Sequence, residues 1–158
     1  MLIDSHAHIQ GKEYAGEAEA VIERARAAGV EKIIAVGGAG DMSSNTEAVA
    51  LADSFPNIYA TVGMHPHDAK DVGADELRAL RELTSHAKVI AVGETGLDYY
   101  YNHSPHEVQR RVFTQFIHMF RDYKWRGATR YEQGGEDQHS IDRARQRVHC
   151  HLYLGAAP

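Results

Sequence analysis

The stretch KIIAVGG at residues 32–38 decides the fold class that the sequence predicts. Its apolar, β-branched residues predict a strand, and the two glycines end it. The strand is continuously apolar rather than alternating, which is typical of a strand covered on both faces of a parallel sheet. Residues 43–55 then carry a helical pattern, with Ser43 or Ser44 as the N-cap. The stretch therefore predicts a strand followed by a helix.

The same order of strand and helix repeats along the first 121 residues. Apolar runs predict further strands at residues 2–3, 57–62 and 88–92, and helical periodicity predicts helices at residues 15–28, 74–86 and 104–120. Repeated strand–helix units predict an α/β fold with a parallel sheet. A closed (β/α)8 barrel and an open doubly wound sheet both fit this pattern, and both place the active site at the carboxyl ends of the strands.

The pattern ends beyond Arg121. Residues 122–147 contain scattered arginines and glycines with few aliphatic residues, and residues 148–154 predict at most one short strand. We therefore divide the chain into residues 1–121, which carry the α/β pattern, and a divergent tail, residues 122–158. The composition of the tail fits disorder or a shifted reading frame.

The composition is that of an ordinary globular protein, with 43% hydrophobic and 25% charged residues among 158. A net charge of −5 argues against a protein that coats DNA with a broad basic face. A single cysteine, Cys150, excludes an internal disulfide, and no apolar run approaches the ~20 residues that span a bilayer. Residues 1–4 are too short and too acidic for a signal peptide. We therefore expect a cytoplasmic protein without a membrane partner.

Polar residues gather directly after the predicted strands, and histidine is unusually frequent, with eleven in the chain. They follow the four predicted strands in this order: His6 and His8, Gly37–Asp41, His65 and His67, Glu94 and Asp98. Because the carboxyl ends of parallel strands meet at one edge, we expect these side chains to lie together. Histidine is the commonest ligand of transition metals, so this edge is the predicted metal site.

His6 and His8 leave the first strand two residues apart. Alternate residues of a strand point to the same side, so both imidazoles can bind one cation. The alternative is that one of them is a hydrogen-bonded loop residue, which is commoner for a lone histidine than for a pair at this spacing. Asp4 and Ser5 are predicted to orient the ligands, because a ligating histidine usually donates its other N–H to a carboxylate or carbonyl.

Glu94 follows the fourth predicted strand, where its carboxylate can add a ligand or bridge two cations. Taken alone, a solvated loop carboxylate would be the better interpretation. His65 and His67 stand at the corresponding edge, but Pro66 between them makes a turn with divergent side chains equally plausible. His65 is then a candidate contact for a substrate phosphate, whereas His67 and Asp68 would close the loop.

Three stretches of the chain together resemble the TatD-related family of metal-dependent hydrolases. They are IDSHAH at residues 3–8, VGMHPHDA at residues 62–69 and VGETGLDY at residues 92–99. The H-x-H pair alone is typical of the wider amidohydrolase-like group, whereas the GETGLD stretch singles out this family. The resemblance covers residues 1–121 and implies an α/β fold of the (β/α)8 TIM-barrel type. A closed barrel usually needs ~250 residues, so we expect one truncated to four or five βα units with an irregular tail.

The resemblance also implies a metal site. His6, His8 and Glu94 would bind two divalent ions, with Glu94 shared between them and with Mg²⁺, Mn²⁺ or Zn²⁺ as the candidate metals. Glu94 and His65 would be the catalytic residues, and His65 would orient the phosphate. His149, within the stretch VHCH, is a further candidate metal ligand, although its neighbours depart from the family pattern. The family's Ile-His-x-Arg motif does not occur in this sequence.

The resemblance implies a hydrolase, a deoxyribonuclease of the TatD type that cleaves phosphodiester bonds of DNA with a metal-activated water. Two alternatives remain. One is a degenerate, inactive metal-binding fragment, and the other is an amidohydrolase-like enzyme that acts on a small amide or ester. A partial barrel leaves strand edges and apolar surface uncovered, so self-association is also expected.

Overall fold

A computed structural model describes residues 2–122 of the chain, and its side chains as far as residue 119. The predicted tail beyond residue 122, and His149 with it, lies outside the described residues. The elements are, in chain order, β1 (Leu2–Ala7), η1 (Lys12–Tyr14), α1 (Ala18–Ala27), β2 (Val30–Val36), α2 (Ser43–Ser54), β3 (Ile58–Val62), η2 (Pro66–Asp71), α3 (Ala74–Thr84), β4 (Val89–Val92) and α4 (His106–Asp122), where η denotes a 3-10 helix. Within this part of the chain, no helix has the length and apolar character needed to cross a membrane.

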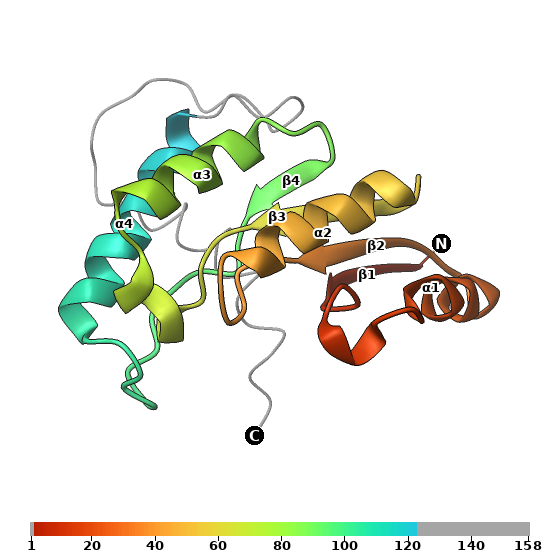
Figure 1. Ribbon diagram of the computed structural model, residues 1–158, viewed down its shortest axis with the longest axis horizontal. Helices are drawn as coiled ribbons and strands as arrows, with labels where there is room; N and C mark the ends of the chain where they lie inside the picture. The colour runs from red at the N-terminus through yellow and green to blue at the C-terminus, as the bar shows by residue number, and fades with distance from the viewer. Residues whose placement is uncertain (1, 123–158) are drawn as a thin grey trace.

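The four strands form one parallel sheet in the order β1-β2-β3-β4 (Figure 1). A helix joins each strand to the next, because parallel neighbours need a crossover connection rather than a hairpin. All four strands and all four helices occur where the hydrophobic patterns predict them, apart from shifts at their ends. The α/β class is confirmed, and the carboxyl ends of the four strands lie at one edge of the sheet.

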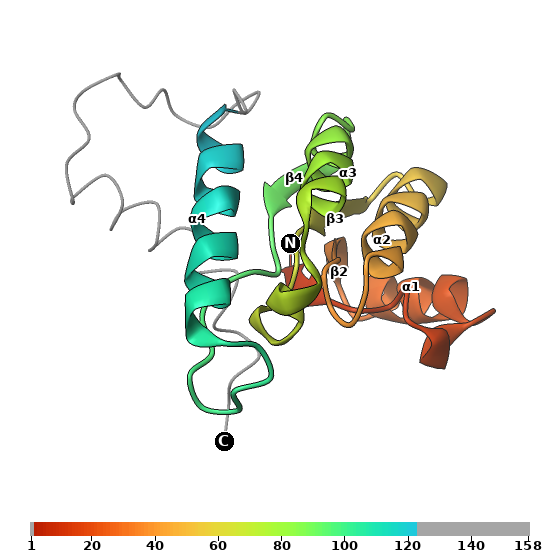
Figure 2. The same ribbon diagram turned by 60° about the vertical axis from the view of Figure 1, so that its left-hand side comes forward.

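α2 and α3 pack side by side against the sheet, and α4 lies beside β4 (Figures 1 and 2). α2 contacts β2 and β3, whereas α3 contacts β3 and β4. Small side chains allow this close approach, since Ala35, Ala60, Ala48 and Ala52 are all completely buried. The carboxyl halves of β2 and β3 are buried throughout, as their continuously apolar sequences predict.

β1 is an exception, because its first residues are exposed. Leu2 and Ile3 keep 59% and 50% of their surface accessible, whereas the last four residues of β2 are all buried. β1 is an edge strand of the described sheet and has β2 as its neighbour. The inference that continuously apolar strands are covered on both faces therefore holds for β2 and β3, but not for β1 and not at Ile90 of β4, which is 36% exposed.

The start of α2 differs from the prediction in a way that matters for the site. Neither Ser43 nor Ser44 is its N-cap residue. Instead, the carboxylate of Asp41 accepts the backbone N–H of Ser43 at 2.7 Å, and the Ser44 hydroxyl accepts the backbone N–H of Gly38 at 2.9 Å. Short polar side chains commonly bind nearby backbone groups in this way. The second bond ties α2 to the glycine turn that follows β2.

Candidate metal centre

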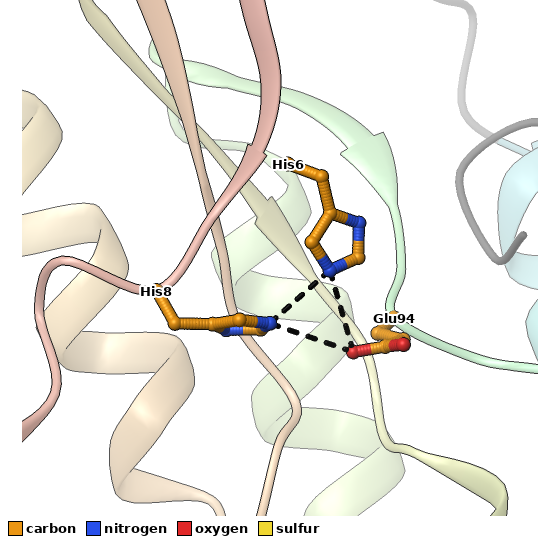
Figure 3. Close-up of side chains that lie close together, drawn as sticks. All are labelled: His6, His8 and Glu94. Atoms are coloured by element: carbon orange, nitrogen blue, oxygen red, sulfur yellow. Dashed lines mark hydrogen bonds and ion pairs between the residues drawn. The ribbon is translucent and has the colours of Figure 1, made fainter. Parts of the chain in front are cut away.

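The carboxyl ends of β1 and β4 bring two imidazoles and one carboxylate together (Figure 3). His6 lies in β1, His8 follows that strand, and Glu94 follows β4. The Nε2 atoms of the two histidines are 3.1 Å apart, and they lie 3.9 and 3.8 Å from Oε2 of Glu94. The three side chains thus converge at one edge of the sheet, as the pattern of parallel strands predicts.

These residues meet from opposite edges of the described sheet. Adjacent strands stand ~4.8 Å apart, so β1 and β4 would be about 14 Å apart in a flat sheet of this order. The histidine and glutamate side chains extend toward each other over the ends of β2 and β3, and curvature of the kind found in a barrel wall shortens the gap. The backbone also contributes, because the N–H of Glu94 donates to the carbonyl of Gly37 at 3.0 Å.

His8 is held in the tautomer that a metal ligand needs. Its Nδ1 lies 2.9 Å from the carbonyl oxygen of Val36, at the end of β2. A carbonyl only accepts hydrogen bonds, so Nδ1 carries the proton and Nε2 keeps its lone pair for a cation. The sequence led us to assign this orienting role to Asp4 and Ser5, but Asp4 instead accepts the backbone N–H of His6 at 3.0 Å.

Glu94 offers its two carboxylate oxygens to different neighbours. The residue is buried, its Oε2 faces His6 and His8, and its Oε1 lies 3.8 Å from Nε2 of His65. A carboxylate with separate neighbours on its two oxygens has the geometry to bridge two cations. The interpretation of Glu94 as a solvated loop carboxylate is therefore wrong.

The spacing of the three donor atoms fits a divalent ion. Ligand atoms that lie ~2.0–2.1 Å from a tetrahedral ion are about 3.4 Å from one another. The observed separations of 3.1, 3.8 and 3.9 Å bracket that value. Two imidazole nitrogens and one carboxylate oxygen are also a donor set that transition metals accept readily.

His65 presents a hydrogen-bond donor next to the same carboxylate. Its Nδ1 accepts the backbone N–H of His67 at 3.2 Å, so the proton of the neutral ring lies on Nε2. Burial lowers the pKa of His65 below its usual value, against the opposing effect of the Glu94 charge. We therefore expect a neutral His65 at neutral pH, with an Nε2–H that can donate to a substrate oxygen.

His67 turns away from this group and pairs with Asp98. Its Nε2 forms a short hydrogen bond with one carboxylate oxygen, and the other oxygen accepts the backbone N–H groups of Tyr100 and Tyr101 at 2.8 and 3.1 Å. Partial burial raises the pKa of Asp98, but these hydrogen bonds together hold it below its usual value. Of the two arrangements that the sequence left open for the second histidine pair, the structure shows the divergent one.

A cavity of about 500 Å³ adjoins the site. Glu94, His65 and His67 line it together with Asp68, Lys70 and His103. The lining therefore combines an ammonium group and three imidazoles with two carboxylates, one of which is that of Glu94 in the candidate metal centre. Such a set of donors can hold an anionic group such as a phosphate ester.

Asn45 fixes the backbone behind the site, and sequence reasoning missed it. Its buried side chain donates to the carbonyl of Gly63 at 3.1 Å and accepts the N–H of the same residue at 2.8 Å. A Cβ at Gly63 would lie 2.8 Å from the carbonyl oxygen of Glu94, so the chain needs a glycine at this point. A signal was present, because Asn45 shares an apolar helical face with Ala48 and Ala52, where an amide is unexpected.

The fold and the site together define a class of protein: metal-dependent hydrolases with a parallel sheet, whose metal ligands are histidines and carboxylates at the carboxyl ends of the strands. A family model described as TatD related DNase matches residues 3–125. The chain belongs to this family. The match confirms the family that the three sequence stretches indicated.

Two curated relatives and one solved structure show how far the likeness extends. YabD of Bacillus subtilis (strain 168), named an uncharacterized metal-dependent hydrolase, is 41% identical over 122 residues, which cover 77% of this chain and 47% of YabD. A protein of Escherichia fergusonii named 3'-5' ssDNA/RNA exonuclease TatD is 32% identical over 112 residues, which cover 71% of this chain and 42% of that protein. The crystal structure of YjjV, a TatD homologue from Escherichia coli K12, matches with a TM-score of 0.67 and 30% identity, and the match covers 75% of this chain and 46% of YjjV.

This chain therefore spans about half the length of the curated relatives it matches. The likeness to YjjV confirms the predicted TIM-barrel type of fold. The described residues contain four of the strand–helix units of such a barrel.

Proposed function

We propose that this protein is a metal-dependent deoxyribonuclease that hydrolyses phosphodiester bonds. One observation carries the proposal: the Nε2 atoms of His6 and His8 and Oε2 of Glu94 lie within 3.9 Å of one another. Membership of the TatD related DNase family supports it, and one relative is named an exonuclease of single-stranded DNA and RNA.

Two divalent ions suit the arrangement of Glu94. His6, His8 and Oε2 of Glu94 would hold one ion, and Oε1 would serve a second on the side of His65. The two imidazoles favour Zn²⁺ or Mn²⁺ over Mg²⁺, which prefers oxygen ligands. Bound there, such ions would lower the pKa of a water molecule and neutralise charge on the phosphate oxygens. His149, the remaining predicted ligand, lies outside the described residues.

His65 is proposed to orient the phosphate. Its Nε2–H can donate to a phosphate oxygen while its Nδ1 stays bonded to the backbone of His67. Because burial lowers the pKa of His65, the ring would bind the substrate as a neutral hydrogen-bond donor. A neutral ring is not repelled by metal cations bound nearby. Lys70, on the wall of the same cavity, adds positive charge for the anionic strand.

The decisive test is hydrolysis of an end-labelled, single-stranded DNA oligomer with added Mg²⁺, Mn²⁺ or Zn²⁺, together with the metal content of the same sample. Glu94→Gln keeps the size of the side chain and removes its charge, so it should lower both the metal content and the rate, the latter by more than about 100-fold. Glu82→Gln changes an exposed carboxylate on α3 and is the matched control, which should leave both unchanged.

Two other outcomes would replace this proposal. Hydrolysis of small esters or amides without cleavage of DNA would identify an amidohydrolase-like enzyme. Metal binding without turnover of either substrate would identify an inactive metal-binding fragment.

A further inference from the structure

Two neighbouring tyrosines beside the site are strongly exposed. Tyr100 and Tyr101 stand in the segment between β4 and α4 and keep 82% and 63% of their surface accessible. Large aromatic side chains stabilise a protein or a complex most when their surface is removed from water. Two adjacent exposed tyrosines therefore indicate a surface that a partner covers.

The backbone that carries these tyrosines is held firmly. Both of their N–H groups donate to the carboxylate of Asp98, at 2.8 and 3.1 Å. The side chain of Gln109, which is 1% exposed, clamps Asp98 in turn, because it accepts the backbone N–H at 2.7 Å and donates to the carbonyl at 2.8 Å. The rings are therefore displayed from a fixed segment, and a partner need not order the backbone when it binds.

A row of aromatic and imidazole rings connects the two tyrosines to Glu94, the carboxylate of the candidate metal centre. His65, whose Nε2 is 3.8 Å from Glu94, has its ring centroid 4.3 Å from that of His67. The His67 ring lies 5.5 Å from that of Tyr101, which lies 4.7 Å from that of Tyr100. The row begins at the buried carboxylate and ends at the exposed surface. A ligand that is anchored at Glu94 and extends outward would meet the tyrosines next.

Tyr99, the third tyrosine in the run, has a different role. Its ring packs on that of His106 with centroids 4.1 Å apart, and its hydroxyl accepts a hydrogen bond from Arg110 at 3.1 Å. These contacts attach it to α4. Tyr101 also stacks on a histidine, His103, with centroids 5.8 Å apart, but it makes no hydrogen bond to α4 among the described contacts and keeps 63% of its surface accessible, against 44% for Tyr99. The surface in question is therefore limited to Tyr100 and Tyr101.

We propose that Tyr100 and Tyr101 form a stacking surface for the unpaired bases of a single strand whose phosphate is bound beside Glu94. This inference rests on the proposed function and adds to it two residues that would contact the bases of the strand. Every base has a face that can stack on a tyrosine ring, so the surface needs no sequence code. Lys70 and the imidazoles of the cavity complement the charge of the backbone, whereas a duplex would keep its bases stacked inside the helix and away from the rings.

The test measures binding without turnover, with the candidate metal present and with phosphorothioate strands that resist hydrolysis. Fluorescence anisotropy would compare a labelled oligothymidylate with a strand of equal length in which abasic residues replace the nucleotides. The wild-type chain should bind the base-containing strand about tenfold more tightly, which is within the range that stacking contributes per base. Tyr100→Ala combined with Tyr101→Ala should abolish this difference, whereas the corresponding pair of Phe substitutions should retain it.

Tyr14→Ala is the matched control, because Tyr14 is an exposed tyrosine in η1, which follows β1 at the opposite edge of the sheet. It should leave the preference intact, and circular dichroism would check that each variant is folded. Equal binding of the two strands by the wild type, binding of neither, or an unchanged preference in the double Ala variant would overturn the proposal. A preference that depends on the tyrosines but comes without hydrolysis in the presence of metal would keep the stacking surface and reject the nuclease.

Discussion

Two histidine pairs with the same spacing behave differently in this protein. In the first pair, the Nε2 atoms of His6 and His8 lie 3.1 Å apart and face one oxygen of Glu94. In the second pair, His65 faces the other oxygen of Glu94, whereas His67 hydrogen-bonds to Asp98. The first His-x-His motif thus directs both side chains to Glu94, whereas the second directs one side chain to Glu94 and the other to Asp98.

The backbone explains the difference. His6 lies in β1, and the extended chain sends alternate side chains to the same side. Pro66 begins the 3-10 helix η2, in which the N–H of Asp68 donates to the carbonyl of His65 at 2.9 Å. With three residues per turn, positions two apart point in different directions. A spacing of two therefore predicts a shared ligand only when the segment is a strand.

The largest expected effect is a difference in metal affinity between variants of the two histidine pairs. His6→Ala removes a donor atom from the proposed site and should weaken the binding of Zn²⁺ or Mn²⁺ by more than about 100-fold. His67→Ala removes a side chain whose Nε2 is engaged with Asp98 and should change the affinity by less than about threefold. Isothermal titration calorimetry on the two variants would measure both values.

His86→Ala serves as the control for this comparison, because His86 pairs with Asp53 at 3.2 Å, away from the candidate site. It should bind metal as the unaltered chain does. An equal loss in His6→Ala and His67→Ala would show that the two pairs are equivalent and that the contrast between them is wrong.

The second prediction concerns Asn45, whose hydrogen bonds to Gly63 hold the backbone that leads to His65 and His67. Asn45→Ala would leave the N–H and the carbonyl of Gly63 buried without their partner, two residues before His65. Each unsatisfied buried group costs about 1–3 kcal/mol, so the free energy of unfolding should fall by about 2–6 kcal/mol. Urea denaturation followed by circular dichroism would measure the change.

Thr46→Ala alters the next residue of α2, which is exposed, and should change the stability by less than about 0.5 kcal/mol. Should Asn45→Ala prove as mild as this control, the amide would have no part in holding the loop.

The smallest effect should appear in acid. Hydrogen bonds hold the pKa of Asp98 below its usual value, so the ionised carboxylate stabilises the fold above the pKa of the unfolded chain. This contribution is lost as the pH falls through the folded pKa. Asp98→Asn should therefore be less stable than the wild type at pH 7, and the difference should shrink as the pH falls below about 3.9, the ordinary pKa of an aspartate.

Melting temperatures at several pH values would follow this difference. Asp71→Asn, which alters an exposed carboxylate in η2, is the control, and its melting temperatures should stay close to those of the wild type. A constant difference between the wild type and Asp98→Asn over the whole range would contradict the assigned role of the Asp98 charge.

The fold could be predicted from the sequence because its signals are local. Apolar runs ended by glycine predicted β2 and β4, and helical periodicity predicted α2 and α4. The convergence of the site residues could be predicted because parallel strands share a carboxyl edge. The solvent exposure of β1 could not, since it depends on what covers the edge of the sheet. Self-association through such edges and residence in the cytoplasm stay predictions.

The partners within the site could not be predicted in the same way. His8 bonds to a carbonyl 28 residues away, Asn45 to a glycine 18 residues away, and His67 to a carboxylate 31 residues away. Each choice depends on how packed elements meet, and no periodicity in the sequence encodes it. The histidine pairs and Glu94 could be identified in the sequence because each stands at the end of a predicted strand. The groups that orient them could not be identified in this way.

The bond between the N–H of Glu94 and the carbonyl of Gly37 joins the ends of β4 and β2, which are not neighbours in the sheet. The chain that leaves β3 passes between them at Gly63, where a Cβ would lie 2.8 Å from backbone atoms of both Gly93 and Glu94. A side chain at position 63 would therefore separate the carboxylate from the histidines even though it offers no ligand atom. In a library of single substitutions selected for metal binding, position 63 should tolerate as little variation as position 94.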